Sequence, residues 1–250
     1  MKLLYRIYQW VIAAPLFIIA TFITAILTSV GSKFLNGDFW GYWPPHYWSK
    51  FTCWIFFIRV KVTGRENINP KTSYIFIANH QGAFDIFAIY GFLDHNFKWL
   101  MKKGLEKIFM VGPACRRANH IFVDDSKMSA IRETIEKAEK TLKDGMSLVI
   151  FPEGSRTWDG KMIPFKRGAF LLASEFNLPV VPMTIEGCFD RMPRYTYNIN
   201  PGTITIHIHK PILPGPNGFN VKNLLKDCFD VVQSGLSEKN QGESVGHRVK

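Results

Sequence analysis

A histidine and an aspartate in this chain stand at a spacing that could support proton transfer. His80 follows the apolar stretch 74–78, and Asp85 comes after four intervening residues. If the apolar stretch is a strand and the chain becomes helical beyond Gly82, the carboxylate can fold back toward the imidazole ring. A carboxylate on one ring nitrogen fixes the tautomer, so the other nitrogen can take a proton from a substrate hydroxyl. The pair predicts a general base, although His-x-x-x-x-Asp alone is a short motif that chance can produce.

A second group of reactive side chains follows another apolar stretch. Residues 147–151 are predicted to form a buried strand, and the run that begins at its last residue, 151–157, reads Phe-Pro-Glu-Gly-Ser-Arg-Thr. In α/β proteins the loops after strand ends build binding sites. Glu153, Ser155 and Arg156 could therefore bind a phosphate group through the guanidinium and neighbouring backbone N–H groups. The alternative is an ordinary turn that holds a salt bridge.

The elements that would position these groups alternate between short strands and helices beyond Gly64. This order predicts an α/β fold with a mixed sheet flanked by helices. Strands are predicted at residues 74–78, 98–101, 121–123, 147–151, 180–185 and 204–209, and helices at 82–93, 128–143, 168–176 and 221–232. The apolar residues of helix 128–143 follow one face, so it is expected to be scaffold. Lys166 and Arg167 precede helix 168–176, an arrangement that favours anions.

The amino-terminal part of the chain carries a membrane signal. No residue from Val11 to Val30 is charged, and this is about the length that crosses the hydrocarbon core as a helix. A cleaved signal peptide is the alternative, but its apolar region is normally shorter, and no good Ala-x-Ala pattern follows Val30. Pro15 can kink or start a helix, so both a span and a re-entrant segment stay open.

An aromatic stretch follows, between Gly37 and Arg59. Trp and Tyr gather at headgroup level because their rings are apolar and their tips polar. Lys33 and Lys50 flank the stretch, which together with the apolar segment before it predicts an interfacial or re-entrant pair of helices. For residues 51–58 an aromatic core element is an equal alternative.

These signals divide the chain into three parts. Residues 1–63 are predicted to be a membrane-embedded or interfacial helical segment, 64–236 the catalytic domain, and 237–250 a flexible tail. Lys2 and Arg6 precede the apolar segment, so the positive-inside tendency puts the amino terminus at the cytoplasmic face. A re-entrant pair would return the catalytic domain to that face, whereas a single span would not.

Composition restricts the partners. The chain has 31 Lys and Arg against 20 Asp and Glu, a net charge of +11, which indicates an anionic partner such as a membrane surface, a nucleotide-bearing co-substrate or a nucleic acid. No nucleic-acid partner is expected, because such binding leaves the apolar segment unexplained.

The motifs of two other enzyme classes are absent from the sequence, namely Gly-x-Ser-x-Gly of serine hydrolases and the glycine-rich phosphate-binding motifs of nucleotide-binding enzymes. The four cysteines are Cys53, Cys115, Cys188 and Cys228. They are scattered and do not show the spacing of zinc ligands, which indicates ordinary thiols in a reducing compartment.

Four blocks, taken in order, resemble the glycerolipid acyltransferase family, and specifically the 1-acyl-sn-glycerol-3-phosphate acyltransferases. They are Asn-His-x-x-x-x-Asp at 79–85, the basic block 112–125, Phe-Pro-Glu-Gly-Ser-Arg at 151–156 and the proline-bearing strand 180–185. The resemblance covers roughly residues 64–211, and the ordered set is far more specific than any one block. It implies that His80 is the general base on the acceptor hydroxyl and that Asp85 orients it. It also implies that Glu153, Gly154 and Arg156 bind the phosphate region of the acceptor.

The resemblance further implies the reaction and its partners. A fatty acyl group would move from a thioester, on coenzyme A or acyl carrier protein, to the free hydroxyl of 1-acylglycerol 3-phosphate, giving phosphatidic acid. The acceptor oxygen would attack the thioester carbonyl directly, with no acyl-enzyme, no metal and no bound cofactor. The partners would be membrane lipids, a lysophospholipid acceptor and the acyl donor.

One departure from the family pattern bears on the acceptor. The second block usually closes as Phe-[Ile/Val]-Asp-Arg, but here Asp125 stands at the arginine position. An acidic residue near a phosphate would repel it, so another lysolipid acceptor stays open. Basic residues that could replace the arginine are Lys102, Lys103, Arg116, Arg117 and Lys127.

The rival to an enzyme is a non-catalytic membrane protein that binds lipid. Such a protein would keep the aromatic and basic surface without needing His80 or Asp85. The intact His80, Asp85, Glu153 and Arg156 favour the enzyme.

Overall fold

The computed structural model describes residues 2–123, 142 and 146–242. The predicted helix 128–143 lies, apart from Leu142, outside these residues, as do Asp125 and Lys127. All elements, contacts and counts given for the molecule refer to these residues.

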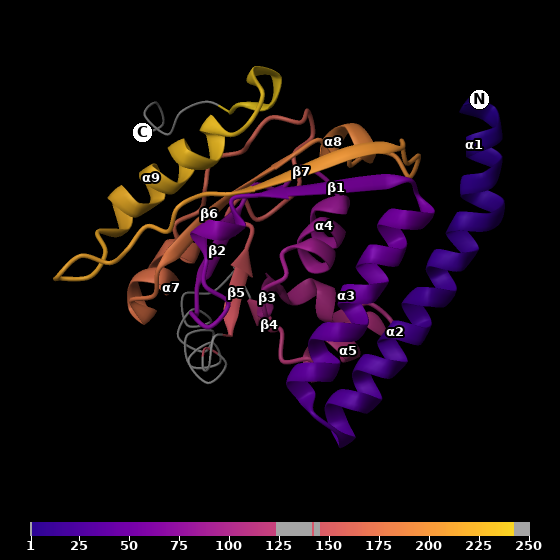
Figure 1. The fold of residues 1–250 in the computed structure, drawn as a ribbon, viewed down its shortest axis with the longest axis horizontal. Helices are drawn as coiled ribbons and strands as arrows, with labels where there is room; N and C mark the ends of the chain where they lie inside the picture. Colours follow the sequence, from indigo (N-terminus) through magenta and orange to yellow (C-terminus); the bar gives the residue numbers. More distant parts are fainter. Residues whose placement is uncertain (1, 124–141, 143–145, 243–250) are drawn as a thin grey trace.

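A seven-stranded sheet forms the centre of the molecule, in the order β1-β7-β6-β2-β5-β3-β4. All neighbouring strands are parallel except β6 and β7, which are antiparallel. The predicted mixed sheet flanked by helices is therefore confirmed (Figure 1). The strands are β1 (Ile58–Thr63), β2 (Ile75–Ala78), β3 (Phe97–Lys102), β4 (Ile121–Val123), β5 (Ser147–Ile150), β6 (Val180–Glu186) and β7 (Gly202–Ile208).

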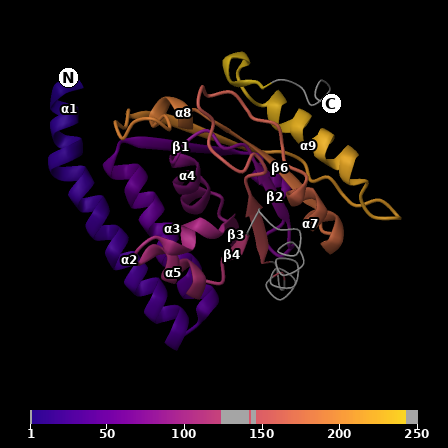
Figure 2. The ribbon, with the colours of Figure 1, turned by 180° about the vertical axis from the view of Figure 1, so that it is seen from behind.

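Helices cover both faces of the sheet (Figures 1 and 2). On one face lie α3 (Gly37–Ile55) and α4 (Phe84–Phe92), and on the other α7 (Gly168–Phe176) and α9 (Val221–Ser234). Two short helices, α5 (Val111–Arg117) and α8 (Cys188–Arg191), complete the domain.

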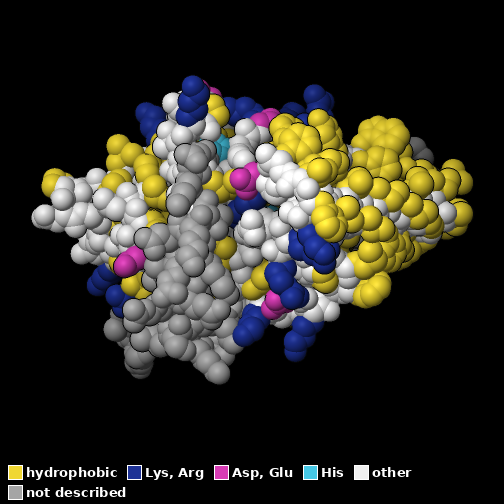
Figure 3. Space-filling model, turned by 90° about the horizontal axis from the view of Figure 1, so that it is seen from below, with side chains coloured by type: hydrophobic (Ala, Val, Ile, Leu, Met, Phe, Trp, Pro, Cys, Tyr) yellow, Lys and Arg dark blue, Asp and Glu magenta, His cyan; other side chains and the backbone are white. Residues whose placement is uncertain are grey.

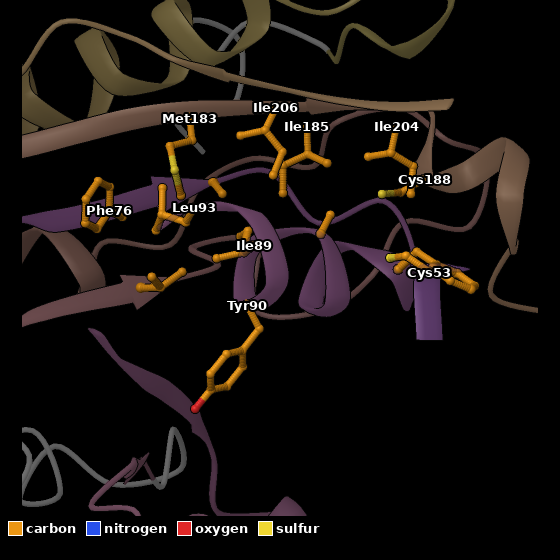
Figure 4. Close-up of a cluster of buried hydrophobic side chains, with 14 of the residues drawn as sticks. Cys53, Phe76, Ile89, Tyr90, Leu93, Met183, Ile185, Cys188, Ile204 and Ile206 are labelled. Carbon is orange, nitrogen blue, oxygen red and sulfur yellow. The ribbon is translucent and has the colours of Figure 1, made fainter. Parts of the chain in front are cut away.

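The central strand β2 shows why the core has two halves. Successive side chains of a strand point to opposite faces, so Phe76 packs toward α4 while Ile75 and Ile77 pack toward α7 and α9. Both faces are covered, and each residue of β2 is buried. Figure 4 shows Phe76 and Met183 of the sheet near Ile89 of α4 and Leu93, the residue that follows this helix. This packing fixes the place where β2 ends and α4 begins.

The amino-terminal residues form one long, bent helix. It comprises α1 (Lys2–Tyr8), a five-residue π-helical turn (Gln9–Ala13) and α2 (Ala14–Phe34). Pro15 lies in the first turn of α2, and the wider π turn precedes it, which accommodates a residue that cannot donate a helical hydrogen bond. By length and composition alone, residues 2–34 could cross a membrane.

The helix α3 folds back beside α2 (Figure 1). Asn36 caps α3, because its side chain accepts the backbone N–H groups of Asp38 and Phe39. Two helices are therefore present where a pair was predicted, and their interfacial or re-entrant placement stays a prediction. The outer surface of this pair is far more apolar than a soluble monomer normally exposes, through Leu3, Leu4, Ile7, Trp10, Val11, Ile12, Leu16, Ile18, Ile19, Phe22, Ile23, Ile26, Leu27, Val30, Phe34, Phe39, Trp43, Tyr47 and Trp54.

Two predicted boundaries differ from the structure. The helical segment does not reach residue 63, because Ile58–Thr63 forms strand β1, which pairs in parallel with β7. The tail is not loose from residue 237, because its first residues pack on the domain. Asn240 is buried, and its carbonyl accepts the backbone N–H of Met162.

Candidate active site

His80 and Asp85 meet at the turn between β2 and α4. Asp85 lies in the first turn of α4, and its Oδ2 atom is 2.7 Å from His80 Nδ1. The backbone N–H of Gly82 donates to the same oxygen at 2.8 Å. Asp85 is fully buried, so its carboxylate faces the imidazole in a water-poor environment. The structure thus brings together the two residues predicted to act as a pair.

Gly82 makes this tight turn possible. A Cβ atom at this position would lie 2.8 Å from the carbonyl oxygen of Cys188 and 3.3 Å from that of Met192. Only glycine lets the backbone approach α8 this closely.

Cys188, the first residue of α8, also lies next to Asp85. Burial and the adjacent Asp85 carboxylate raise the pKa of the Cys188 thiol well above its ordinary value, so this thiol stays protonated.

The His80 ring is held in one orientation by its neighbours. It stacks on Phe151 at a centroid distance of 4.1 Å and an interplanar angle of 8°, and Phe151 stacks in turn on Trp99. The carbonyl of His80 accepts the backbone N–H of Thr157. The His80 side chain is 15% exposed. Because Asp85 bonds to Nδ1 of its ring, Nε2 is the nitrogen left to accept a proton.

Glu153 braces the backbone of His80. Its Oε1 accepts the backbone N–H of His80 at 2.7 Å, and its Oε2 accepts that of Ile163 at 2.8 Å. The residue is 3% exposed and both oxygens accept backbone N–H groups, so Glu153 positions the backbone of His80. Its contact with the acceptor phosphate stays a prediction. Burial raises the pKa of Glu153 to about 8, although the two N–H donors act in the opposite direction.

This shift predicts a pH dependence of stability. The ordinary pKa of the carboxyl group is 4.5, so between pH 4.5 and about 8 the folded chain binds a proton that the unfolded chain has lost. The free energy of unfolding should therefore fall as the pH rises through this window. Glu153→Gln should remove most of this dependence, as measured by melting temperature in detergent from pH 5 to 8.5. The exposed Glu175→Gln is the matched control, and parallel curves for wild type and Glu153→Gln would contradict the assignment.

A pocket that carries two lysines in an otherwise mainly apolar wall, which we name the cationic pocket, lies beside this centre. Gly154, Lys102 and Lys166 line it together with Phe151, the residue that stacks on His80. Gly154 has a positive φ of 72°, and a Cβ atom there would lie 2.9 Å from Lys166 Nζ. Glycine thus allows the Lys166 amine to lie directly over the loop. The first residues of α7 complete the pocket, so two ammonium groups and a helix amino terminus favour an anion here.

Arg156 lies in the same loop, and a neighbouring arginine holds its backbone. Arg194 donates from Nη1 to the Arg156 carbonyl at 2.9 Å and stacks over Trp158 at 4.2 Å. Ser155 lies between Gly154 and Arg156 and is half-buried. The loop 151–157 is therefore fixed from two sides, by Glu153 within the core and by Arg194 at the rim.

The other basic residues predicted to bind the acceptor lie elsewhere. Arg116 and Arg117 belong to α5, and neither is among the residues that line the pocket beside Gly154. Arg116 is paired with Glu106 at 3.0 Å, and Arg117 lines a shallow groove against α2. Among the predicted replacements for the missing arginine that the structure describes, Lys102 is the one in the pocket.

An apolar cavity of about 230 Å³ adjoins this pocket. Its wall is almost entirely hydrophobic and comes from α2, α3, α4, β3 and α5. Met101 lines both the cavity and the cationic pocket, so the two are neighbours on opposite sides of one side chain. The cavity residues include Ala25, Trp48, Ile86, Tyr90, Trp99, Leu105, Ile108 and Ala114.

Three residues of this site were not expected from the sequence. The stacking of Phe151 and Trp99 and the bond from Arg194 join segments that are distant in sequence. Phe151 precedes the Pro-Glu-Gly motif, which assigns it no role of its own. Nothing in the sequence around Trp99 or Arg194 distinguishes them from core or surface residues.

An imidazole paired with a buried carboxylate, beside a pocket that carries two lysines and adjoins an apolar cavity, is suited to an enzyme that deprotonates a hydroxyl of an amphiphile. The acyltransferase family model matches residues 59–186, about half of the chain. The chain belongs to the acyltransferase family.

Curated relatives agree with this family. A 1-acyl-sn-glycerol-3-phosphate acyltransferase of Chlamydomonas reinhardtii is 31% identical over 64% of this chain and 49% of its own length. The enzyme of that name from Saccharomyces cerevisiae is 34% identical over 67% of this chain and 54% of its own length. The chain thus spans about half the length of the curated relatives it matches.

A solved structure matches nearly the whole chain. It is the crystal structure of the 1-acyl-sn-glycerophosphate (LPA) acyltransferase PlsC from Thermotoga maritima, with a TM-score of 0.76 and 29% identity. The match covers 94% of this chain and 96% of that chain, so it includes the amino-terminal helices.

Proposed function

We propose that this protein transfers a fatty acyl group from a thioester to the free hydroxyl of 1-acylglycerol 3-phosphate, giving phosphatidic acid. The observation that carries the proposal is the position of His80, which pairs with buried Asp85 and stacks on Phe151 in the wall of the cationic pocket. The apolar cavity adjoins that pocket at Met101. The acceptor has a phosphate, a hydroxyl and an acyl chain, and these chemistries match the three features. The names of the relatives support this substrate.

His80 would act as the general base of the reaction, because Asp85 bonds to its Nδ1 atom. Nε2 takes the proton of the acceptor hydroxyl as its oxygen attacks the thioester carbonyl, and Asp85 stabilises the imidazolium that forms. The tetrahedral intermediate collapses, the carbon–sulfur bond breaks, and the thiolate recovers the proton from His80. Each cycle returns His80 to its neutral state without a covalent acyl-enzyme or a bound cofactor. The donor, on coenzyme A or acyl carrier protein, is a co-substrate.

The cationic pocket would bind the phosphate of the acceptor, and the apolar cavity would bind an acyl chain. Lys102 and Lys166 would bind the acceptor phosphate, and Arg156 would act at the edge of the same loop. The apolar cavity would receive an acyl chain, because its wall offers almost no polar atoms to hold water.

We also propose that the catalytic domain works at the cytoplasmic face of a membrane. Arg6 donates to the carbonyl of Ile199 and to Asn200 Oδ1, so the amino-terminal end of the long helix lies beside the catalytic domain. This contact and the hairpin of α2 and α3 support a re-entrant arrangement in which the amino terminus and the active site share one face. The basic residues before the apolar segment favour the cytoplasm.

An acceptor panel tests the proposed function. Purified full-length protein would be assayed with a long-chain acyl-CoA or acyl carrier protein and with lysophosphatidic acid, lysophosphatidylcholine or lysophosphatidylethanolamine. Lysophosphatidic acid is expected to be the preferred acceptor. A stronger reaction with another lysolipid would reassign the acceptor, and no turnover with any of them would favour a non-catalytic lipid-binding protein.

The cavity predicts a change in acyl-chain preference. Ala25 is 5% exposed and lines the cavity, so Ala25→Phe should occupy space that the end of a long chain needs. The variant should lose activity with the longest donors and keep it with shorter ones, as measured by initial rates across a series of acyl-CoA lengths. Val30→Phe, on the half-exposed outer face of the same helix, is the matched control. An equal loss at every chain length would argue against a chain-binding cavity.

A further inference from the structure

A loop beside α2 presents unusually exposed apolar side chains. The loop joins β3 to α5, and with α5 it forms residues 103–117, which we name the basic loop. Leu105 is 44% exposed, Ile108 46% and Phe109 79%, and Phe109 is the most exposed large apolar side chain among the described residues. Three such residues within five positions form a patch and not a scatter of single exposures.

The backbone of this loop is tightly turned and holds Phe109 outward. Met110 has a positive φ of 58°, which residues other than glycine rarely adopt. The N–H of Val111 donates to the Phe109 carbonyl, and that of Gly112 donates to the Ile108 carbonyl. A Cβ atom at Gly112 would lie 2.0 Å from the carbonyl oxygen of Glu106, so glycine is required for this turn.

The patch continues the apolar surface of α2. Residues 106–110 and Arg117 border a groove whose opposite wall includes Ile26 and Val30, both about half exposed. On its inner side the same loop lines the apolar cavity through Leu105 and Ile108. The basic loop therefore separates the cavity from the surface that α2 presents.

Charge around the patch indicates what covers it. Within residues 103–117 the exposed basic side chains are Lys103, Lys107, Arg116 and Arg117, and this segment contains one acid, Glu106, which is paired with Arg116. Figure 3 shows Lys and Arg side chains gathered next to a broad hydrophobic surface. Apolar side chains flanked by cations suit a bilayer with anionic headgroups, where rings enter the acyl region and ammonium groups stay at the surface.

We propose that the basic loop is a membrane contact in its own right, which inserts Phe109, Ile108 and Leu105 into an anionic bilayer beside α2. The contact places the wall of the apolar cavity at the lipid surface, where a chain can pass between the bilayer and the cavity. The inference rests on the membrane location in the proposed function and not on acyl transfer. Activity and loop insertion can therefore fail separately.

Spin labelling of the full-length chain tests this contact. A label would be attached at Phe109→Cys or, as a control, at Leu213→Cys, which is 67% exposed and lies after β7. Both variants carry Cys115→Ala, since the remaining thiols are buried. Flotation first verifies binding to phosphatidylcholine vesicles with and without phosphatidylglycerol. Collisions with oxygen, which partitions into lipid, and with the water-soluble nickel complex Ni-EDDA then report the position of each label.

In anionic vesicles the ratio of oxygen to nickel collisions at position 109 should rise several-fold above the ratio in lipid-free protein, while position 213 should not change. Lys107→Gln with Arg117→Gln should reduce the rise, whereas Lys210→Gln with Lys222→Gln, two exposed lysines elsewhere, should not. Equal accessibility of the two labels on bound protein would overturn the contact. Equal insertion without phosphatidylglycerol would overturn the headgroup preference. Protection of position 109 in lipid-free protein would indicate a contact with a second copy and overturn the proposal.

Discussion

Replacing His80 with alanine is expected to lower the rate of acyl transfer by about 10³-fold, because general-base catalysis typically contributes 10²- to 10⁴-fold. Asp85 bonds to Nδ1 of the His80 imidazole, which leaves Nε2 to take the proton of the acceptor hydroxyl. Without this imidazole the acceptor hydroxyl must lose its proton to water. The measurement is the initial rate with lysophosphatidic acid and a long-chain acyl-CoA at saturating concentrations of both.

The control must separate chemistry from folding, because His80 also stacks on Phe151. His80→Gln keeps a planar polar group against Phe151 but cannot act as a base, so it should be as inactive as the alanine variant while melting close to wild type. His207→Ala, at an exposed histidine on β7, should keep full activity. Activity that survives in His80→Ala would remove His80 from the mechanism.

Continuous apolar runs made the central strands predictable. Ile121–Val123 was predicted with the bounds of β4, and the predictions for β2 and β5 extend each strand by one residue, because both are buried on two faces and read as unbroken apolar segments. Strand β1 was missed because Arg59 and Lys61 interrupt it. It lies at the sheet edge, where alternate side chains face solvent, and its sequence merges with the aromatic stretch before it.

The local part of the site was predictable, and the long-range part was not. His80 and Asp85 are five residues apart, so one strand-to-helix turn decides whether they meet. Glu153 is 73 residues from His80, and a motif cannot say whether its carboxylate faces a substrate or a backbone N–H. The sheet decides this, because β2 and β5 are parallel neighbours and bring both loops to one edge. The cavity is lined by residues spread from Thr21 to His120, so it depends on the packing of several helices and was not predictable at all.

Asp85→Asn is expected to lower the rate by about 10²-fold or more, and Asp85→Ala to lower it further, since an orienting carboxylate both fixes the tautomer and stabilises the imidazolium. In the wild type, Oδ2 accepts from both His80 Nδ1 and the Gly82 N–H. An asparagine must turn its oxygen toward this position, because its NH₂ group would oppose the Gly82 donor. Gly82 therefore keeps the useful tautomer in Asp85→Asn, and the variant loses only the negative charge. Alanine loses the charge and the tautomer together. Initial rates of both variants, with melting temperatures to verify folding, measure the difference. Equal rates for the asparagine and alanine variants would mean that Gly82 does not select the orientation of the amide. Wild-type rates in both variants would leave Asp85 without a role in the proton transfer.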